Sequence, residues 1–195
     1  MSGAFSRREL MTSPPAPHRL GPVCLVVMGV SACGKSEVGR QVAAQLGGVF
    51  IDGDDHHPEE NVSKMASGTP LAEEDRWPWL DALQAIMQGH LADAPADCPL
   101  VVACSALKRI YRERLQGGLP DGQVRFVHLD LPFKAALSRI EGRRDHFMKG
   151  RHMLEDQFAT LEPLAAEELA AGSFAVDAGR PLNEVVAAVV GGVGG

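Results

Sequence analysis

The sequence predicts an α/β fold with three layers, in which a parallel sheet lies between two layers of helices. Apolar, β-branched segments of strand length alternate along the chain with segments of helical periodicity, the pattern typical of such folds. The chain has 195 residues, of which 45% are hydrophobic and 23% charged, as in an ordinary globular protein. A chain of this length buries about 70% of its unfolded surface, which is enough for one core. We therefore expect a single folded domain at residues 22–195, after a flexible N-terminal tail at residues 1–21.

Five segments have the composition of strands. The first, Val-Cys-Leu-Val-Val-Met at 23–28, is apolar at every position, as expected for a strand buried on both faces of a parallel sheet. The others are shorter apolar runs. The predicted strands cover residues 23–28, 49–51, 100–104, 124–129 and 174–176.

Helical periodicity lies between these strands. Val38, Val42 and Leu46 share one face of a helix that two glycines end. Pro78 and Pro132 fit the first turn of two further helices, where a proline loses no hydrogen bond. The predicted helices cover residues 37–46, 78–91, 107–115, 132–140 and 181–190.

Charge and cysteine content narrow the class of protein. The chain has 25 acidic and 19 basic residues, a net charge of −6, which argues against nucleic acids and anionic membranes as main partners. The four cysteines have neither CxxC pairing nor zinc-ligand spacing, so we expect reduced thiols in a cytoplasmic protein. The N-terminal segment lacks the apolar run of a signal peptide. A mitochondrial presequence is the alternative interpretation of Arg7, Arg8 and Arg19, although Glu9 and several prolines disfavour it.

Residues 29–36 match the pattern G-x-x-x-x-G-K-[ST] of a phosphate-binding loop, or P-loop. In such a loop the lysine reaches the β- and γ-phosphates, the hydroxyl is a Mg²⁺ ligand, and backbone N–H groups surround the phosphates. The alternative is a glycine-rich turn that binds nothing, but a buried strand before the pattern and a helix after it are the context that a P-loop requires. The predicted nucleotide-binding residues are Gly29, Val30, Ser31, Ala32, Cys33, Gly34, Lys35 and Ser36.

The surroundings of the P-loop favour a kinase of small metabolites. The chain has no N-K-x-D motif for reading guanine and is short for a large motor ATPase. The segment at about 142–152 is basic and poor in aliphatic residues, which suggests a lid over the nucleotide. An ordinary solvated connection is the alternative for this segment.

Two carboxylates follow the second predicted strand, in Asp52-Gly53-Asp54. Ligands of an open α/β sheet bind beyond the C-terminal ends of the strands, so this pair is expected near the P-loop. One carboxylate could hold a hydrated Mg²⁺, while the other orients an attacking hydroxyl or accepts its proton. The alternative is an Asp-Gly turn that caps the next helix. The neighbouring P-loop favours the functional interpretation.

The chain resembles the gluconokinase family over nearly all of residues 23–190. The resemblance rests on motifs more specific than a P-loop: D-G-D-x-x-H-P at 52–58, K-M-x-x-G-x-P-L at 64–71 and C-S-A-L-K at 104–108. Other matching residues are Asn61, Asp75, Arg76, Pro78, Trp79, Leu80, Tyr111, Arg112, Arg139, Arg143, His146, Phe147, Gln157, Phe158, Leu161 and Glu162.

This resemblance implies phosphorylation of D-gluconate by ATP on the 6-hydroxyl, giving 6-phospho-D-gluconate for the pentose phosphate and Entner–Doudoroff routes. It also implies a five-stranded parallel sheet like that of shikimate and nucleoside monophosphate kinases, with a helical substrate region and a lid. ATP and Mg²⁺ would be required, and the protein would be a homodimer.

The same resemblance implies a site for a polyhydroxy carboxylate. Asp54 would hold the 6-hydroxyl, other polar residues would bind the remaining hydroxyls, and Arg or Lys residues would bind the carboxylate. A solvated helix face is the alternative for Arg76 and Arg112. The expected substrate-binding residues are Asp54, His57, Asn61, Lys64, Arg76, Ser105, Lys108 and Arg112, and the expected metal ligands are Ser36 and Asp52.

Arg139 and Arg143 are expected on the helix that leads into the lid. In related folds such arginines cover the adenine and stabilise the transferred phosphoryl group, although either could instead form a surface ion pair. Arg139 is therefore assigned to the nucleotide, and Lys35, Asp54 and Arg143 form the expected catalytic set.

Two other functions are open, and the chain departs from the family pattern in its lid. The chain could phosphorylate another small hydroxy acid such as shikimate, or bind nucleotide without turnover, although the Asp52–Asp54 pair argues against the latter. The lid has Asp145 where glycine is usual. Cys33 is expected to be either a partly accessible thiol, made reactive by loop amides and Lys35, or a small apolar filler.

Overall fold

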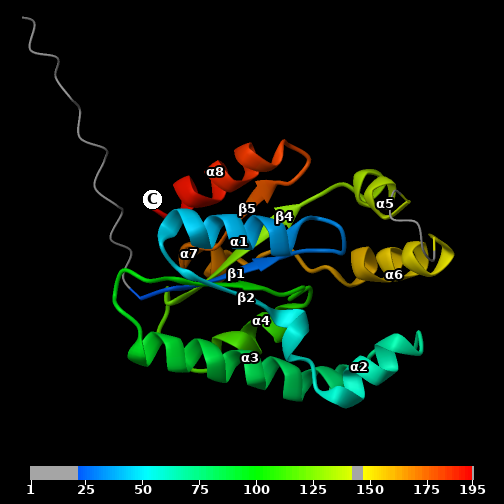
Figure 1. Ribbon diagram of the computed structural model, residues 1–195, viewed down its shortest axis with the longest axis horizontal. Coiled ribbons are helices and arrows are strands. Elements are labelled where there is room, and N and C mark those ends of the chain that lie inside the picture. Colours follow the sequence, from blue (N-terminus) through cyan, green and yellow to red (C-terminus); the bar gives the residue numbers. More distant parts are fainter. Residues whose placement is uncertain (1–21, 142–146, 195) are drawn as a thin grey trace, which may run out of the picture.

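The computed structural model describes residues 22–141 and 147–194. Five parallel strands form one sheet in the order β2-β3-β1-β4-β5, with helices on both faces (Figure 1). The predictions of a three-layer α/β fold and a five-stranded parallel sheet are confirmed. The strands are β1 (Cys24–Met28), β2 (Val49–Asp52), β3 (Leu100–Ala103), β4 (Val124–Asp130) and β5 (Phe174–Asp177).

Helices connect successive strands. Two of them, η1 and α2, follow β2 before the long helix α3 begins. The helices are α1 (Lys35–Leu46), the 3₁₀ helix η1 (Gly53–His56), α2 (Glu59–Ala66), α3 (Glu73–Asp93), α4 (Arg109–Gln116), α5 (Phe133–Glu141), α6 (Phe147–Thr160), α7 (Ala166–Ala170) and α8 (Leu182–Val193).

Alternate residues of the central strand belong to separate cores on the two faces of the sheet. Leu25 and Val27 pack on the side of α1 and α8, whereas Val26 and Met28 pack on the side of α3 and α4. Figure 1 shows α1 and α8 above the sheet and α3 and α4 below it. Every residue of β1 is buried, as the uniformly apolar sequence at 23–28 predicts.

The parallel register brings the ends of the strands to one edge of the sheet. Asp52 pairs with Ala103 of β3, which in turn pairs with Val27 of β1. Strands in a sheet are about 4.8 Å apart, so the end of β2 lies roughly 10 Å from the end of β1. The loops that follow these strands therefore share one edge of the sheet.

The largest differences from the predicted helices are at α3 and α6, and no helix was predicted where α6 lies. α3 begins at Glu73, so Pro78 lies inside the helix and not in its first turn, and the predicted start is wrong. The carboxylate of Asp75 accepts a hydrogen bond from the Ala72 N–H at 2.8 Å, which stabilises the earlier start. α6 begins at Phe147, so the predicted loop at 142–152 is wrong for its second half.

The short helices η1, α2 and α7 were not predicted from the periodicity. Asn61 is the one buried residue of α2, and α7 has none. Helices without a buried apolar stripe give no periodic signal in the sequence.

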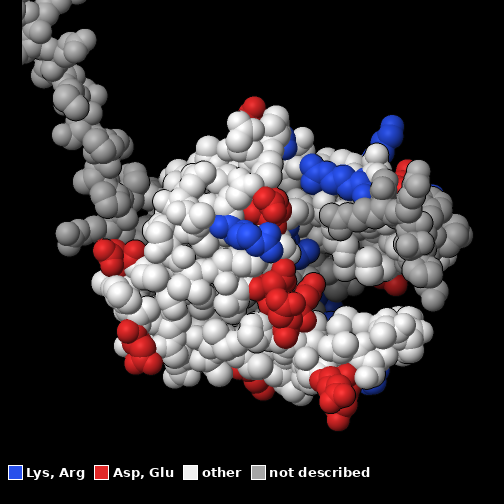
Figure 2. All heavy atoms as spheres, in the orientation of Figure 1, with Lys and Arg blue, Asp and Glu red and all other residues white. Residues whose placement is uncertain are grey.

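The space-filling view shows an indentation between the part of the molecule that carries α5 and α6 and the part that carries α2 (Figure 2).

Within the described residues, no helix has both the length and the apolar composition to cross a bilayer.

Candidate functional site

The loop between β1 and α1 has the backbone of a phosphate-binding loop. Gly29 has a φ of +140°, and a Cβ there would lie 2.9 Å from the Leu129 carbonyl oxygen, so glycine is required for both conformation and space. Gly34, immediately before α1, has a φ of +101°. These two positions are the glycines of the sequence pattern, and each is fixed by a local steric requirement.

Lys35 and Ser36 begin α1, at the end of the helix where unpaired N–H groups attract anions. The Lys35 Nζ donates to the Val30 carbonyl at 3.0 Å, so the side chain folds back across its own loop. Both side chains are half-buried at the strand-end edge of the sheet.

Two side chains from α5 and α6 contact the P-loop backbone. The Ser31 N–H donates to the Gln157 Oε1 at 2.6 Å. The guanidinium of Arg139 donates to the carbonyls of Ala32 and Cys33 at 3.2 and 3.4 Å, and to that of Ala178 at 2.8 Å. Arg139 therefore lies beside the P-loop and the loop after β5, where its predicted nucleotide-binding role would place it.

Cys33 does not have the accessibility that a reactive thiol requires. It is 2% exposed and belongs to the core on the α1 side of the sheet. Burial raises the pKa of its thiol, outweighing the opposite effects of Lys35 and Arg139. The expectation of a partly accessible, reactive Cys33 is thus wrong, and the small apolar filler is the correct alternative.

The carboxylates of Asp52 and Asp54 flank the start of η1. The Asp52 Oδ1 accepts a hydrogen bond from the Asp54 N–H at 3.3 Å, which caps η1, and the Asp54 side chain is exposed. Between them, Gly53 is buried, and its carbonyl accepts a hydrogen bond from the Trp79 Nε1 at 2.7 Å. The capping turn, which was the alternative interpretation of Asp52, is therefore present and leaves Asp54 free to face a ligand.

The carboxylate pair and the P-loop lie within electrostatic reach of one thiol. Burial raises the pKa of Cys104, at the end of β3, to about 12; the backbone N–H of Ala106 and the charge of Lys35 act to lower it, whereas Asp54 and Asp52 add to the rise. β3 lies between β2 and β1, so Cys104 lies between the strand that ends at Asp52 and the strand that leads into the P-loop. This order places the Asp52–Asp54 pair and Lys35 at the same edge of the sheet.

His57 and Asn61 form a connected pair under the carboxylates. The ring of His57 stacks on Trp79, and the Asn61 Nδ2 lies 3.3 Å from the His57 Nδ1 and 2.7 Å from the Asp75 carbonyl. Asn61 is 3% exposed. Asn61 therefore supports His57 and the start of α3. The prediction that its side chain binds the substrate is wrong, because the side chain is buried.

Four polar residues surround the start of α3. Lys64 pairs with Asp75 at 2.5 Å, and Lys108 pairs with Glu73 at 2.6 Å. The hydrogen bond that Lys64 donates to Asp75 is the main cause that lowers the pKa of Asp75, and the hydrogen bond that Lys108 donates to Glu73 is the main cause that raises the pKa of Lys108. Two of the basic residues predicted to bind the substrate, Lys64 and Lys108, thus have carboxylate partners at the start of α3.

Arg76 and Lys108 approach the same aromatic ring. The Arg76 Cζ lies 5.8 Å from the ring centroid of Tyr111, and the Lys108 Nζ lies 5.5 Å from it. One Arg76 nitrogen, Nη1, donates to the carbonyls of Leu71 and Ala72. The structure therefore gathers two of the three cations predicted to bind a carboxylate.

The third of these cations, Arg112, is not placed to bind substrate. Its side chain is fully buried and pairs with Glu168 at 2.6 Å. Its remaining N–H groups donate to backbone carbonyls. The predicted substrate-binding role of Arg112 is therefore wrong, because no donor is left for a ligand.

Arg143 and Asp145 lie outside the described residues, as does the first half of the predicted lid. Glu73 and Gln157 were missed as candidate site residues. Gln157 occurs in a family motif, but no signal in the sequence linked it to Ser31, 126 residues away.

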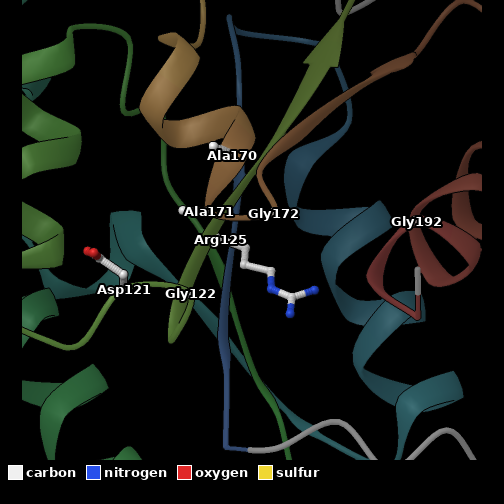
Figure 3. Close-up of a pocket in the computed structure, with 7 residues that line it drawn as sticks. All are labelled: Asp121, Gly122, Arg125, Ala170, Ala171, Gly172 and Gly192. Carbon is white, nitrogen blue, oxygen red and sulfur yellow. The ribbon is translucent and has the colours of Figure 1, made fainter.

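A cavity of about 370 Å³ lies at the opposite end of the sheet from the P-loop (Figure 3). It is lined by Gly122 and Arg125 at the start of β4 and by Gly172 before β5. The Arg125 Nη1 donates to the Val193 carbonyl at 3.1 Å. Because all strands are parallel, this cavity is separated from the P-loop by the length of the sheet.

Comparison with known proteins agrees with this geometry. Residues 31–189 match the family model described as shikimate kinase. The thermoresistant gluconokinase of Escherichia coli is 42% identical over 165 residues, which are 85% of this chain and 90% of that protein. A probable gluconokinase of Mus musculus is 41% identical over 87% of this chain and 96% of its own length.

Solved structures give the same result. A gluconokinase from Sinorhizobium meliloti aligns with a TM-score of 0.74 and 42% identity, covering 90% of this chain and 93% of the other. A shikimate kinase from Aquifex aeolicus shares the fold alone, with a TM-score of 0.52 and 16% identity over 86% of this chain and 94% of its own. This chain, with its P-loop beside an Asp-Gly-Asp turn, therefore belongs to the shikimate kinase family and, within it, to the gluconokinases.

Proposed function

We propose that this protein is an ATP-dependent gluconate kinase that transfers the γ-phosphoryl group of ATP to the 6-hydroxyl of D-gluconate. The observation that carries the proposal is the position of Asp54, exposed at the end of β2 and at the same sheet edge as the P-loop. The gluconokinase relatives named above support D-gluconate as the acceptor.

Asp54 orients the 6-hydroxyl and accepts its proton as the phosphoryl group transfers in line. Lys35 turns from the Val30 carbonyl to the β- and γ-phosphates when ATP enters, and Arg139 of α5 faces the nucleotide. The role of Arg143 in stabilising the transferred phosphoryl group is proposed from the family resemblance alone. Because phosphoryl transfer depends mainly on positioning and electrostatics, no covalent enzyme intermediate is needed.

The residues at this edge suit Mg²⁺, which prefers hard oxygen ligands and retains several waters. The hydroxyl of Ser36 and the carboxylate of Asp52 are such donors, and both are half-buried. Ser36 and Asp52 would hold the Mg²⁺ ion that accompanies ATP, and the ion would supply positive charge against the phosphates.

The carboxylate of gluconate binds near Arg76 and Lys108, and its hydroxyls meet His57, Lys64 and Ser105. Without substrate, Lys108 pairs with Glu73 and Lys64 pairs with Asp75, so gluconate binding would exchange or extend these two ion pairs. We further propose that the protein acts in the cytoplasm as a homodimer, which light scattering on the purified chain would test.

The test is an acceptor panel with the purified protein and Mg-ATP, in which ADP release is coupled to a detector. The panel contains D-gluconate, other sugar acids, shikimate and a reaction without acceptor. We expect gluconate to give the highest kcat/KM, and ³¹P and ¹³C spectra of the product to place the phosphate on carbon 6. Preference for shikimate or another hydroxy acid would change the assigned substrate, and ADP release independent of every acceptor would contradict the kinase function.

A further inference from the structure

Arg112 forms the most densely connected polar group in the described part of the chain. All five of its N–H groups are used. Nε and Nη2 donate to the two Glu168 oxygens at 2.6 and 3.0 Å. Nη2 also reaches the Pro163 carbonyl at 3.1 Å, and Nη1 reaches the carbonyls of Ala106, Leu107 and Glu162 at 3.2–3.3 Å. These acceptors come from two separate segments, the turn after β3 and residues 162–168, which form the connection after α6 and the first residues of α7.

The turn after β3, residues 105–108, has a strained backbone. Ala106 has a φ of +43°, a conformation that residues with a Cβ rarely adopt, and its side chain is fully buried. Strained conformations of this kind persist only where the surroundings fix them. Here the Ser105 carbonyl accepts the Gly29 N–H of the P-loop at 3.2 Å, and Arg112 holds the next two carbonyls.

This turn carries two residues of the proposed acceptor site. Ser105 precedes the strained residue and Lys108 ends the turn, where its Nζ meets Glu73 from the start of α3. The direction in which both side chains point depends on the conformation of Ala106.

We propose that Arg112 is a positioning residue for phosphoryl transfer, which keeps the 105–108 turn in the conformation that presents Ser105 and Lys108 to the acceptor. The inference rests on the proposed function for the identity of the acceptor. The geometry of Arg112 and the 105–108 turn does not depend on that identity.

The second segment held by Arg112 leads to the nucleotide side of the site. The Glu162 N–H donates to the Leu107 carbonyl at 2.8 Å, and the Glu162 Oε2 accepts the Arg109 N–H at 2.5 Å. Five residues earlier, on α6, Gln157 accepts the Ser31 N–H of the P-loop. Arg112 thus fixes the acceptor turn relative to a helix that also contacts the P-loop, and small errors in this alignment are costly for transfer between two bound substrates.

Glu168 makes this position specific for arginine. Its side chain is 13% exposed, accepts two hydrogen bonds from Arg112 and accepts the Ala165 N–H at 2.7 Å. Burial raises the pKa of Glu168, but the hydrogen bonds and the charge of Arg112 prevail and lower it overall. A lysine could keep the charge but not the planar, five-donor geometry.

The decisive variants are Arg112→Lys and Glu168→Gln, assayed with acceptor and ATP varied separately. We expect Arg112→Lys to lower kcat/KM for the acceptor by about 10- to 100-fold while KM for ATP stays unchanged. Glu168→Gln should also lower kcat/KM for the acceptor, by a smaller factor. If Arg112→Lys does not fold, Glu168→Gln alone tests whether Arg112 is a positioning residue. Arg114→Lys is the matched control, because Arg114 lies on the same helix and pairs with Asp81 at the surface.

A rescue experiment separates positioning from general stability. Glycine adopts a positive φ without strain, so Ala106→Gly should restore part of the acceptor kcat/KM when combined with Arg112→Lys. The proposal is overturned if Arg112→Lys lowers kcat only in proportion to the folded fraction, with both KM values unchanged, or if Arg114→Lys has the same effect. If the wild-type protein prefers an acceptor other than gluconate, the proposed function fails and the same measurements are made with that acceptor.

Discussion

The ring of His57 lies parallel to the indole of Trp79, with centroids 4.1 Å apart and planes inclined by 17°. Trp79 is buried and its Nε1 donates to the Gly53 carbonyl, so a single side chain supports both the histidine and the turn between the two carboxylates. The Asn61 Nδ2 is a donor, so the His57 Nδ1 accepts its hydrogen bond and the proton of the neutral ring lies on Nε2. This leaves Nε2–H as a donor for a substrate hydroxyl.

The stacking predicts how stability depends on pH. Burial, assisted by Arg76 and opposed by Asp54, lowers the pKa of His57 below its usual 6.5. Between the folded and unfolded pKa values the unfolded chain binds more protons, so His57 lowers stability as pH falls below 6.5. We expect the melting temperature to fall from pH 7.5 to pH 5.5, and to fall less in His57→Gln. An identical pH dependence in the variant would show that His57 is not the titrating group.

Asp54→Asn should lower kcat by about 10²- to 10³-fold, because the amide cannot accept the hydroxyl proton. ATP affinity should stay unchanged, because in the proposed mechanism Asp54 acts on the acceptor and not on the phosphates. The measurement is steady-state kinetics together with calorimetric titration of a non-hydrolysable ATP analogue. Asp55→Asn, at the exposed neighbouring position on η1, is the control and should keep wild-type kcat. A wild-type kcat in Asp54→Asn would remove Asp54 from the mechanism.

Lys35→Met should weaken ATP binding and abolish turnover together. A charge-assisted hydrogen bond contributes about 1.5–3 kcal/mol, so the Kd for ATP should rise about 10- to 100-fold. In the protein without nucleotide the lysine makes one hydrogen bond, to the Val30 carbonyl, so little stability should be lost. Arg40→Met, at an exposed position of the same helix, is the control. Unchanged ATP affinity and turnover in Lys35→Met would contradict the assignment of the P-loop.

Gly53→Ala should destabilise the fold and displace both carboxylates. A Cβ at this position would lie 2.6 Å from the Ala103 carbonyl oxygen of β3, which cannot move without breaking the sheet. Overpacking of this kind costs about 1–3 kcal/mol, and kcat should fall as well because Asp52 and Asp54 shift. Gly89→Ala in α3 is the control, since nothing lies within 4 Å of its Cβ, and it should stabilise the helix by up to about 1 kcal/mol. Urea unfolding of both variants checks the contrast.

Alkylation should begin at Cys98 and not in the P-loop. Cys98 is half-buried, whereas Cys24, Cys33 and Cys104 are buried. Burial raises the pKa of Cys24 and of Cys104 to about 12, so their reactive thiolate forms are scarce at neutral pH. Peptide mapping after brief iodoacetamide treatment should find label on Cys98, with kinase activity retained. Rapid labelling of Cys33 that Mg-ATP prevents would restore the reactive-loop hypothesis.

The sequence by itself determined the features that depend on neighbouring residues. The P-loop is a contiguous pattern whose glycines answer local steric demands at Gly29 and Gly34, so it could be predicted together with the strand before it and the helix after it. Every residue of β1 is buried, and an unbroken apolar run is the direct signature of such a strand. Motif spacing likewise placed Asp52 and Asp54 at a strand end.

Only the tertiary structure decided which polar and thiol side chains are buried and which residues far apart in the sequence contact one another. Arg112 stands beside Lys108 in a helical segment that looks like a solvated face, yet Glu168, 56 residues later, closes over it. Cys33 stands in a ligand loop but points into the core, and Gln157 reaches Ser31 across 126 residues. Local sequence records propensity and periodicity. Burial and long-range pairing depend instead on which segments pack together, and that is settled by the sheet order and by the helices that cover it.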